Sequence, residues 1–107
     1  IETEFSRFTD YDFTFSFDEL GKGDWGRETA HAIGGTHYIN APGGEEFIFK
    51  NKFSDLGMEL GFIQPKLEPY NQNSKEFVIG LSILDVLFCN GKEKTLEIIK
   101  NYEIKWV

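Results

Sequence analysis

The side chains with the clearest capacity for chemistry are the closely spaced carboxylates of residues 10–18. Polar and aromatic residues alternate through this run without a break. Successive side chains of a strand point to opposite faces, so the run predicts one aromatic face and one acidic face. The aromatic face comprises Tyr11, Phe13, Phe15 and Phe17, and the opposite face comprises Asp10, Asp12, Thr14, Ser16 and Asp18. An acidic face of this kind suits either water or the Lys and Arg side chains of a basic partner.

Other chemistries find little support in the sequence. A calcium loop of the EF-hand type that starts at Asp10 would need Gly at its sixth position and Glu at its twelfth, where Phe15 and Gly21 stand. The two histidines have no further His or Cys clustered with them to complete a metal site. Cys89 ends an apolar run, which is typical of a buried, unreactive thiol. We therefore expect no metal, no cofactor and no enzymatic activity.

Length and composition predict a single domain that spans residues 1–107. The chain has 40% hydrophobic residues and 11 phenylalanines, which are enough to fill one core. Its net charge of −7 argues against nucleic acid and anionic membranes as partners, since both repel an acidic surface. Residues 1–30 hold eight acidic and three basic side chains, so the excess negative charge is concentrated in this part of the chain.

Cysteine content and hydropathy bear on the compartment. Cys89 is the only cysteine, so no internal disulfide can form, which fits a reducing compartment and equally a periplasmic protein without disulfides. The sequence has no run of 18 apolar residues and no signal peptide, and we therefore expect a cytoplasmic protein without a transmembrane helix. The first residue is Ile1 rather than Met, which leaves open whether a leader was removed before it.

Three further segments have the pattern of strands, and one has the pattern of a helix. Residues 45–53 and 56–63 place apolar side chains on one face, and residues 36–39 form a third, short strand. The apolar faces comprise Phe47, Phe49 and Phe53 in the first strand and Leu56, Met58, Leu60 and Phe62 in the second. A short helix is predicted over residues 24–33, because Asp24 could cap its start and Gly34 could end it.

Residues 76–89 are ambiguous. They are almost continuously apolar, which fits both a helix and a strand that is buried on both faces. The following Asn90-Gly91 pair is a strong hairpin signal and favours a strand that turns into a last strand over 96–106. We therefore predict a mainly β fold, with an antiparallel sheet that forms a sandwich or half-barrel and at most one or two short helices. If residues 76–89 are helical, the alternative is an α+β fold.

The predicted partner-binding surface combines acidic residues with one aromatic anchor. Trp25 lies among charged residues in a glycine-rich segment, which is typical of an interface hot spot. A tryptophan that closes one end of the core is the alternative interpretation. The predicted partner-binding residues are Asp10, Asp12, Asp18, Glu19, Asp24, Trp25 and Glu28. A solvated acidic face without a partner is the simpler interpretation of the same carboxylates.

In size, charge and composition, this acidic, Phe-rich and cysteine-poor chain resembles the immunity proteins of bacterial toxin systems, in particular those of contact-dependent growth inhibition. The resemblance is carried by the whole chain rather than by a motif. It implies a cytoplasmic inhibitor that binds a cognate basic toxin domain, often a nuclease, and covers its active site without itself contacting nucleic acid or membrane. The alternative is a β module that binds a carbohydrate or small molecule through Trp25, Tyr38 and Tyr70.

Overall fold

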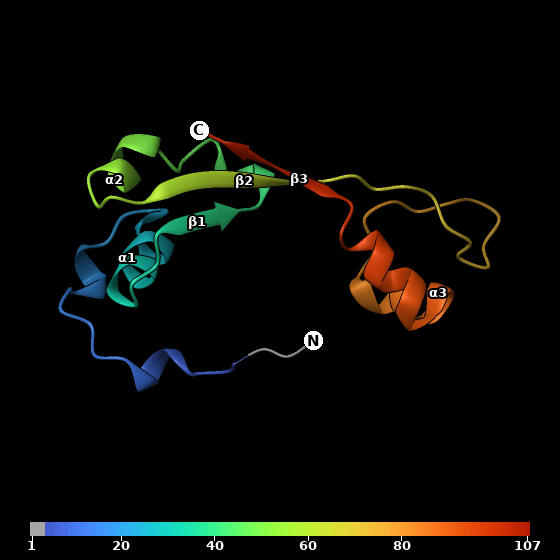
Figure 1. Cartoon of the computed structure of the whole chain (residues 1–107), viewed down its shortest axis with the longest axis horizontal. Coiled ribbons are helices and arrows are strands. Elements are labelled where there is room, and N and C mark those ends of the chain that lie inside the picture. The colour runs from blue at the N-terminus through green and yellow to red at the C-terminus, as the bar shows by residue number, and fades with distance from the viewer. Residues whose placement is uncertain (1–3) are drawn as a thin grey trace. The chain divides into compact units, whose positions relative to one another are not determined.

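Residues 4–107 are described by a computed structural model, and they form three α-helices, three strands and three short 3-10 helices (Figure 1). The α-helices are α1 (Asp24–Ala32), α2 (Lys50–Ser54) and α3 (Ile83–Ile98), and the strands are β1 (His37–Asn40), β2 (Glu59–Pro65) and β3 (Tyr102–Trp106). The 3-10 helices are η1 (Phe8–Asp10), η2 (Phe17–Glu19) and η3 (Pro42–Gly44). The strands hold only four, seven and five residues. The predicted mainly β fold is therefore wrong, and the α+β alternative describes the molecule.

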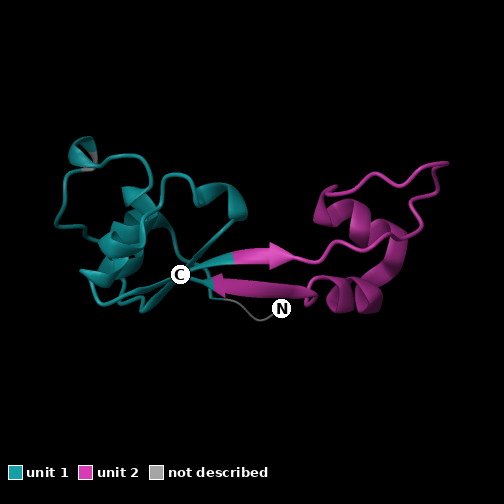
Figure 2. Cartoon of the chain, turned by 90° about the horizontal axis from the view of Figure 1, so that it is seen from above, with its two compact units in different colours: residues 1–62, 106–107 teal, residues 63–105 magenta. Residues whose placement is uncertain are grey.

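The chain divides into two compact units (Figure 2). Unit 1 comprises residues 1–62 and 106–107, and unit 2 comprises residues 63–105. Unit 1 therefore holds α1, α2 and β1, whereas unit 2 holds α3. Strands β2 and β3 each contribute residues to both units.

The three strands form one sheet in the order β1-β2-β3. β1 and β2 run parallel, in a register that pairs His37 with Glu59, Tyr38 with Leu60, Ile39 with Gly61 and Asn40 with Phe62. β3 runs antiparallel to β2, because the Val107 N–H donates to the Leu60 carbonyl near the start of β2 and the Lys66 N–H donates to the Asn101 carbonyl just after its end. A single mixed sheet of three strands is neither a sandwich nor a half-barrel, so this part of the fold prediction is also wrong.

The hydrophobic core lies in unit 1. Its buried side chains are Ile48, Phe53, Met58, Leu60 and Phe62, and the half-buried Ala30, Tyr38, Phe47 and Leu56 pack against them. The strand predicted over residues 56–63 is confirmed in part: β2 begins at Glu59, and Met58, Leu60 and Phe62 lie in this core, whereas Leu56 packs against it from the turn before the strand. Helix α1 packs on the same core through β1.

Helix α1 matches the predicted helix to within one residue at its C-terminal end. Gly34 follows the helix with a φ of 79°, in the left-handed region where glycine is the favoured residue. Within α1, a β-carbon at Gly26 would collide with the hydroxyl group of Tyr38 in β1. The glycine therefore allows α1 to lie directly against the strand.

Residues 10–18 are not a strand. The segment runs from η1 to η2 without pairing to the sheet, and the carboxylate of Asp10 accepts a hydrogen bond from the Arg7 N–H at 2.8 Å. Local hydrogen bonds between a side chain and the backbone of this kind compete with the hydrogen bonds that pair strands in a sheet. The aromatic rings stack on each other instead of lining a sheet, with the Phe13 ring 4.5 Å from that of Phe8 and 5.1 Å from that of Phe15. The side chain of Phe17 lies outside the part of the chain that the structure describes.

Residues 45–53 are not a strand either. The backbone bonds of residues 44–48 form turns, and α2 begins at Lys50. In this arrangement Phe53 is 1% exposed, whereas Phe49 is 55% exposed, so the two rings do not share the face that strand alternation predicts. Phe49 is the N-cap of α2 and has an extended backbone conformation, with φ −108° and ψ 129°, so its side chain does not follow the helical spacing that places Phe53 in the core.

The predicted central strand at residues 76–89 is wrong, because α3 begins within it. The Ser82 hydroxyl accepts a hydrogen bond from the Leu84 N–H at 3.2 Å and caps the helix. A continuously apolar run shows neither the helical nor the strand periodicity, so periodicity does not identify the helix. The Ser82 cap marks where the helix begins. Only residues 102–106 of the predicted last strand are extended, since residues 96–98 belong to α3.

The predicted hairpin at Asn90-Gly91 is a kink inside α3. Gly91 adopts φ 72° and ψ 174°, a conformation that interrupts the helix. Two side chains satisfy carbonyl groups at the break: Asn90 donates to the Val86 carbonyl at 2.8 Å, and Thr95 donates to the Gly91 carbonyl at 2.7 Å. Gly91 does adopt a positive φ, as a hairpin turn would require, but it marks a kink in a helix instead of a turn between strands.

Candidate functional site

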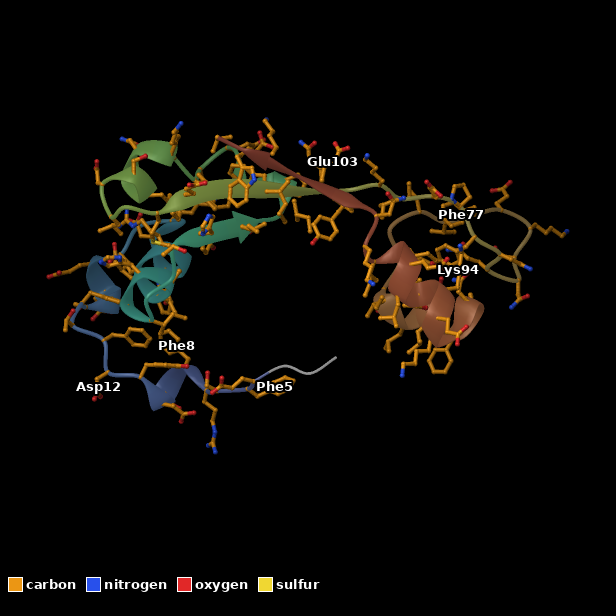
Figure 3. All side chains as sticks on the ribbon, viewed as in Figure 1. Phe5, Phe8, Asp12, Phe77, Lys94 and Glu103 are labelled. Atoms are coloured by element: carbon orange, nitrogen blue, oxygen red, sulfur yellow. The ribbon has the colours of Figure 1, made fainter. Side chains whose placement is uncertain are left out.

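The predicted partner-binding residues lie in unit 1 but do not form one strand face. They are Asp10 in η1, Asp12 on the irregular segment after it (Figure 3), Asp18 and Glu19 in η2, and Asp24, Trp25 and Glu28 in α1. The predicted acidic face of a strand over residues 10–18 is therefore wrong, because these residues are not on one strand. A binding role for these residues individually stays a prediction.

Asp24 and Glu28 have basic partners within unit 1. One carboxylate oxygen of Asp24 lies 2.7 Å from the Lys52 ammonium and 3.4 Å from the Arg27 guanidinium. The other accepts the Gly21 N–H at 3.1 Å. The hydrogen bond from Lys52 is the main cause that lowers the pKa of Asp24 below its ordinary value. Glu28 accepts a hydrogen bond from the Arg27 Nε at 2.9 Å. Of these contacts, the pair of Lys52 and Asp24 ties α2 to α1.

Trp25 lies at the surface of unit 1. Its side chain is 51% exposed, and its ring stacks near that of Phe8 with 6.5 Å between the centroids. It therefore does not close one end of the core, and its role as an interface anchor stays a prediction. The aromatic residues of the alternative β module are divided between the units, because Tyr38 also lies in unit 1 whereas Tyr70 lies in unit 2.

A hydrogen-bonded cluster around Asp85 organises unit 2. The Tyr70 hydroxyl donates to the Asp85 carboxylate at 2.6 Å, and the Gln72 amide donates to the same oxygen at 3.3 Å. The hydrogen bond to Asp85 is the main cause that raises the pKa of Tyr70. The thiol of Cys89 lies 3.9 Å from the other oxygen, and desolvation raises the pKa of that thiol, in keeping with an unreactive cysteine. The cluster fastens the segment before α3 to the first half of the helix.

A cleft of about 420 Å³ lies within unit 2, and both Tyr70 and the C-terminal half of α3 line it. Three lysines line it, together with polar and apolar neighbours, and we call it the lysine cleft. Its residues are Lys66, Glu68, Pro69, Tyr70, Lys94, Glu97, Ile98, Lys100 and Asn101.

Three separate segments of unit 2 form the lysine cleft. Lys94 lies on α3 (Figure 3), Lys66 follows β2, and Lys100 lies in the short connection between α3 and β3. The hydrogen bond from the Lys66 N–H to the Asn101 carbonyl, 2.8 Å long, joins the end of β2 to the start of β3. The Asn101 amide also donates to the Glu68 carboxylate at 3.1 Å. These bonds hold the walls of the cleft together.

The lysines of the cleft retain unused hydrogen-bond donors. Lys66 pairs with Glu103, and Lys94 pairs with Glu97 at 2.8 Å, which raises the pKa of Lys94 and lowers that of Glu97. The Lys100 ammonium makes no hydrogen bond or ion pair with residues 4–107. Each ammonium carries three N–H donors, so one carboxylate does not satisfy any of them completely. The lining residues alone have one more lysine than glutamate, and the Glu103 carboxylate outside the lining pairs with Lys66, so Lys100 carries the charge that no carboxylate offsets.

The lining of the lysine cleft is suited to binding an anionic group. A Lys ammonium is a compact point charge that favours phosphate or carboxylate groups. Among residues 4–107, no group of three or more His, Cys, Asp or Glu side chains is placed to hold a metal ion. No helix in that range is long and apolar enough to cross a membrane.

Sequence reasoning found the acidic residues and missed the lysine cleft. Lys66 and Lys100 are far apart in the sequence and belong to no motif, so only the fold brings them together. The one available signal is the composition of the last seventeen residues, which hold four Lys and three Glu in an otherwise acidic chain. This excess of one lysine over glutamate marks a locally basic region. It does not indicate that Lys66, earlier in the sequence, lines the same cleft.

Comparisons with known proteins give one family. The model of the WbqC-like protein family matches residues 1–97. No curated protein and no solved structure matches the chain. This family is different from the toxin immunity proteins, so the resemblance to them was wrong, and the predicted neutralisation of a toxic nuclease is overturned with it. The match includes Lys66 and Lys94 of the cleft, whereas Lys100 lies beyond it.

Proposed function

The chain belongs to the WbqC-like protein family, and we propose that it binds a small anionic molecule in the lysine cleft of unit 2. The observation that carries the proposal is the convergence of Lys66, Lys94 and Lys100 on one cleft. Three ammonium groups from separate segments define a positive site in a chain whose net charge is −7. The ligand would carry a phosphate or carboxylate group.

The size and lining of the lysine cleft support a small ligand. Its volume of about 420 Å³ falls within the ~300–1,000 Å³ typical of small-molecule sites. Pro69 and Ile98 supply apolar surface, and Tyr70 supplies a ring. The body of the ligand would rest against this surface while its anionic group accepts hydrogen bonds from the lysines.

The charge distribution along the chain also supports an anion at this site. Unit 1 contains five basic and twelve acidic residues, so it carries the entire net charge of −7. Unit 2 contains six basic and six acidic residues and is neutral as a whole. An anion is repelled by the first distribution and not by the second, which favours binding at the cleft of unit 2.

Binding without catalysis in the cytoplasm completes the proposal. In the lining, the hydrogen bond to Glu97 raises the pKa of Lys94 and keeps its amine protonated, and the thiol of Cys89, outside the lining, stays protonated because desolvation raises its pKa. A single cysteine in the chain supports a reducing compartment.

The test is calorimetric titration of the chain with inorganic phosphate and, separately, with acetate at constant ionic strength. We expect saturable binding of at least one of these anions. Lys100→Gln should weaken the affinity by about tenfold, since a charged hydrogen bond is worth ~1.5–3 kcal/mol. Lys75→Gln is the matched control, because Lys75 is an exposed lysine of unit 2 that does not line the cleft. The proposal is wrong if the two variants bind equally well, or if neither anion binds.

A further inference from the structure

The first half of α3, before the kink at Gly91, exposes an unusual amount of apolar surface. Four of its side chains form what we call the apolar face of α3. They are Ile83, Leu84, Leu87 and Phe88, which are 51%, 59%, 40% and 85% exposed. Exposed single apolar residues are ordinary on soluble proteins, but a contiguous set on one element indicates an interaction site.

The helix places these four side chains on one side. At ~100° per residue, they fall within an arc of about 140°. Asp85, Val86 and Cys89 fall on the remaining arc and make the contacts within unit 2: Asp85 bonds Tyr70, and the Val86 side chain is 9% exposed. The polar side chains of this half-helix therefore face their own unit, and the outward side is purely apolar. A surface helix of a monomer instead turns its apolar side toward the core and its polar side toward water.

The apolar surface extends beyond the helix in the sequence. Val78, Ile79 and Leu81, which precede α3, are 52%, 62% and 45% exposed. About half of seven large apolar side chains amounts to several hundred Å², the patch size at which an interaction site is expected. It is also a large share of the ~800 Å² that each partner contributes to a standard protein interface.

We propose that the apolar face of α3 is covered by the same face of a second copy of this chain, which makes the protein a homodimer. Because the face carries no charged side chain, its partner must be apolar too, and homodimer interfaces are the most apolar class. A two-fold axis across the helix pairs two antiparallel copies of α3. Residues at the start of the face then meet residues at its end, so that Leu84 packs near Phe88 of the second copy and the reverse.

The charges of unit 2 permit this contact despite the acidity of the chain. Two copies of a protein with a net charge of −7 repel each other. Unit 2 is neutral, with six basic and six acidic residues, so an interface between two copies of unit 2 avoids that repulsion. An interface built on unit 1 would bring together two units that each carry a net charge of −7. The location of the apolar face on the neutral unit thus favours self-association.

The test is sedimentation equilibrium of the 107-residue chain over the micromolar range. We expect a mass of twice 12.3 kDa for the wild type. Phe88→Glu and, independently, Leu84→Glu should halve the mass, since each places two carboxylates against apolar surface of the dimer. Both side chains are exposed in the single chain, so the variants should fold, and circular dichroism checks this.

Phe5→Glu is the matched control. Phe5 is 91% exposed and lies in unit 1, so the same substitution there should leave the mass at twice that of one chain. A wild-type protein that sediments as a single chain throughout would overturn the proposal. So would a Phe5→Glu variant that dissociates as fully as Phe88→Glu. Capture of a single-chain species by phosphatidylcholine vesicles would instead assign the apolar face to lipid. None of these outcomes bears on anion binding by the lysine cleft.

Discussion

Unit 1 and unit 2 are stabilised by different means. Unit 1 buries five large apolar side chains, whereas only Val86 and Thr95 have buried side chains in unit 2. Unit 1 also carries all the net charge, while unit 2 is neutral and holds both the lysine cleft and the apolar face of α3. Unit 1 is stabilised by its hydrophobic core and carries the net charge at its surface. Unit 2 is stabilised by the hydrogen-bonded cluster around Asp85, and its surface provides the two candidate binding sites.

The largest expected effect is the loss of a core ring in unit 1. Phe53→Ala should destabilise the protein by about 3–5 kcal/mol, because it removes a buried aromatic side chain and leaves a cavity. Phe49→Ala, four residues earlier with a ring that is 55% exposed, is the control and should cost much less. Urea denaturation measures both. Equal losses would show that Phe53 is not part of a packed core.

The next effect concerns the kink of α3 in unit 2. Gly91→Ala should cost about 1–3 kcal/mol, since a side chain is strained at φ 72° and ψ 174°. Gly43→Ala is the control, because a β-carbon there meets open space. Denaturation monitored by helical circular dichroism measures both variants. A Gly91→Ala variant that is more stable and more helical than the wild type would mean that α3 is straight.

A smaller effect is expected from the Asp85 cluster at high pH. The pKa of Tyr70 is raised, so the folded state prefers the protonated phenol. This contribution is fully present below the pKa of an unfolded tyrosine, ~10, and is lost as pH rises through the higher folded value. Tyr70→Phe should lower stability at neutral pH and remove this part of the alkaline loss. Urea midpoints of both proteins at neutral and alkaline pH give the answer, and parallel pH curves would contradict the assignment.

The smallest effect concerns the ion pair between Asp24 and Lys52 in unit 1. Lys52→Gln should cost a few tenths to ~1 kcal/mol, because Lys52 is partly exposed and such pairs are weak. The pKa of Asp24 is lowered in the folded state, so its contribution is present above the unfolded pKa, ~3.9, and is lost as pH falls through the folded value. The variant should therefore lose less stability in acid than the wild type. Lys50→Gln is the control, and identical acid curves for both variants would exclude the pair as a cause.

Local signals were sufficient for parts of unit 1. Helix α1 could be predicted because Asp24 and Gly34 mark its ends, and β2 because Met58, Leu60 and Phe62 alternate over its core face. Residues 10–18 failed although they alternate better than any other segment. Alternation describes a strand only when a neighbouring strand pairs with it, and that neighbour is a property of the whole chain.

Unit 2 was harder to predict for two physical reasons. Its central segment is apolar on all sides, so periodicity could not distinguish a helix from a strand, and the positive φ of Gly91 serves a kink as well as a hairpin. The lysine cleft depends on residues such as Lys66 and Lys100, which meet only after β2 and β3 have paired. No pattern of nearby residues reports a contact of this kind.

The central claim is that the lysine cleft of unit 2 binds a small anion. The most direct measurement is the perturbation of backbone amide resonances when inorganic phosphate is added to the chain. The account predicts saturable shifts at Lys66, Lys94, Lys100 and Asn101, with the amides of α1 and of the acidic segment before it unchanged. Saturable shifts centred on unit 1, or small shifts spread evenly over both units, would contradict it.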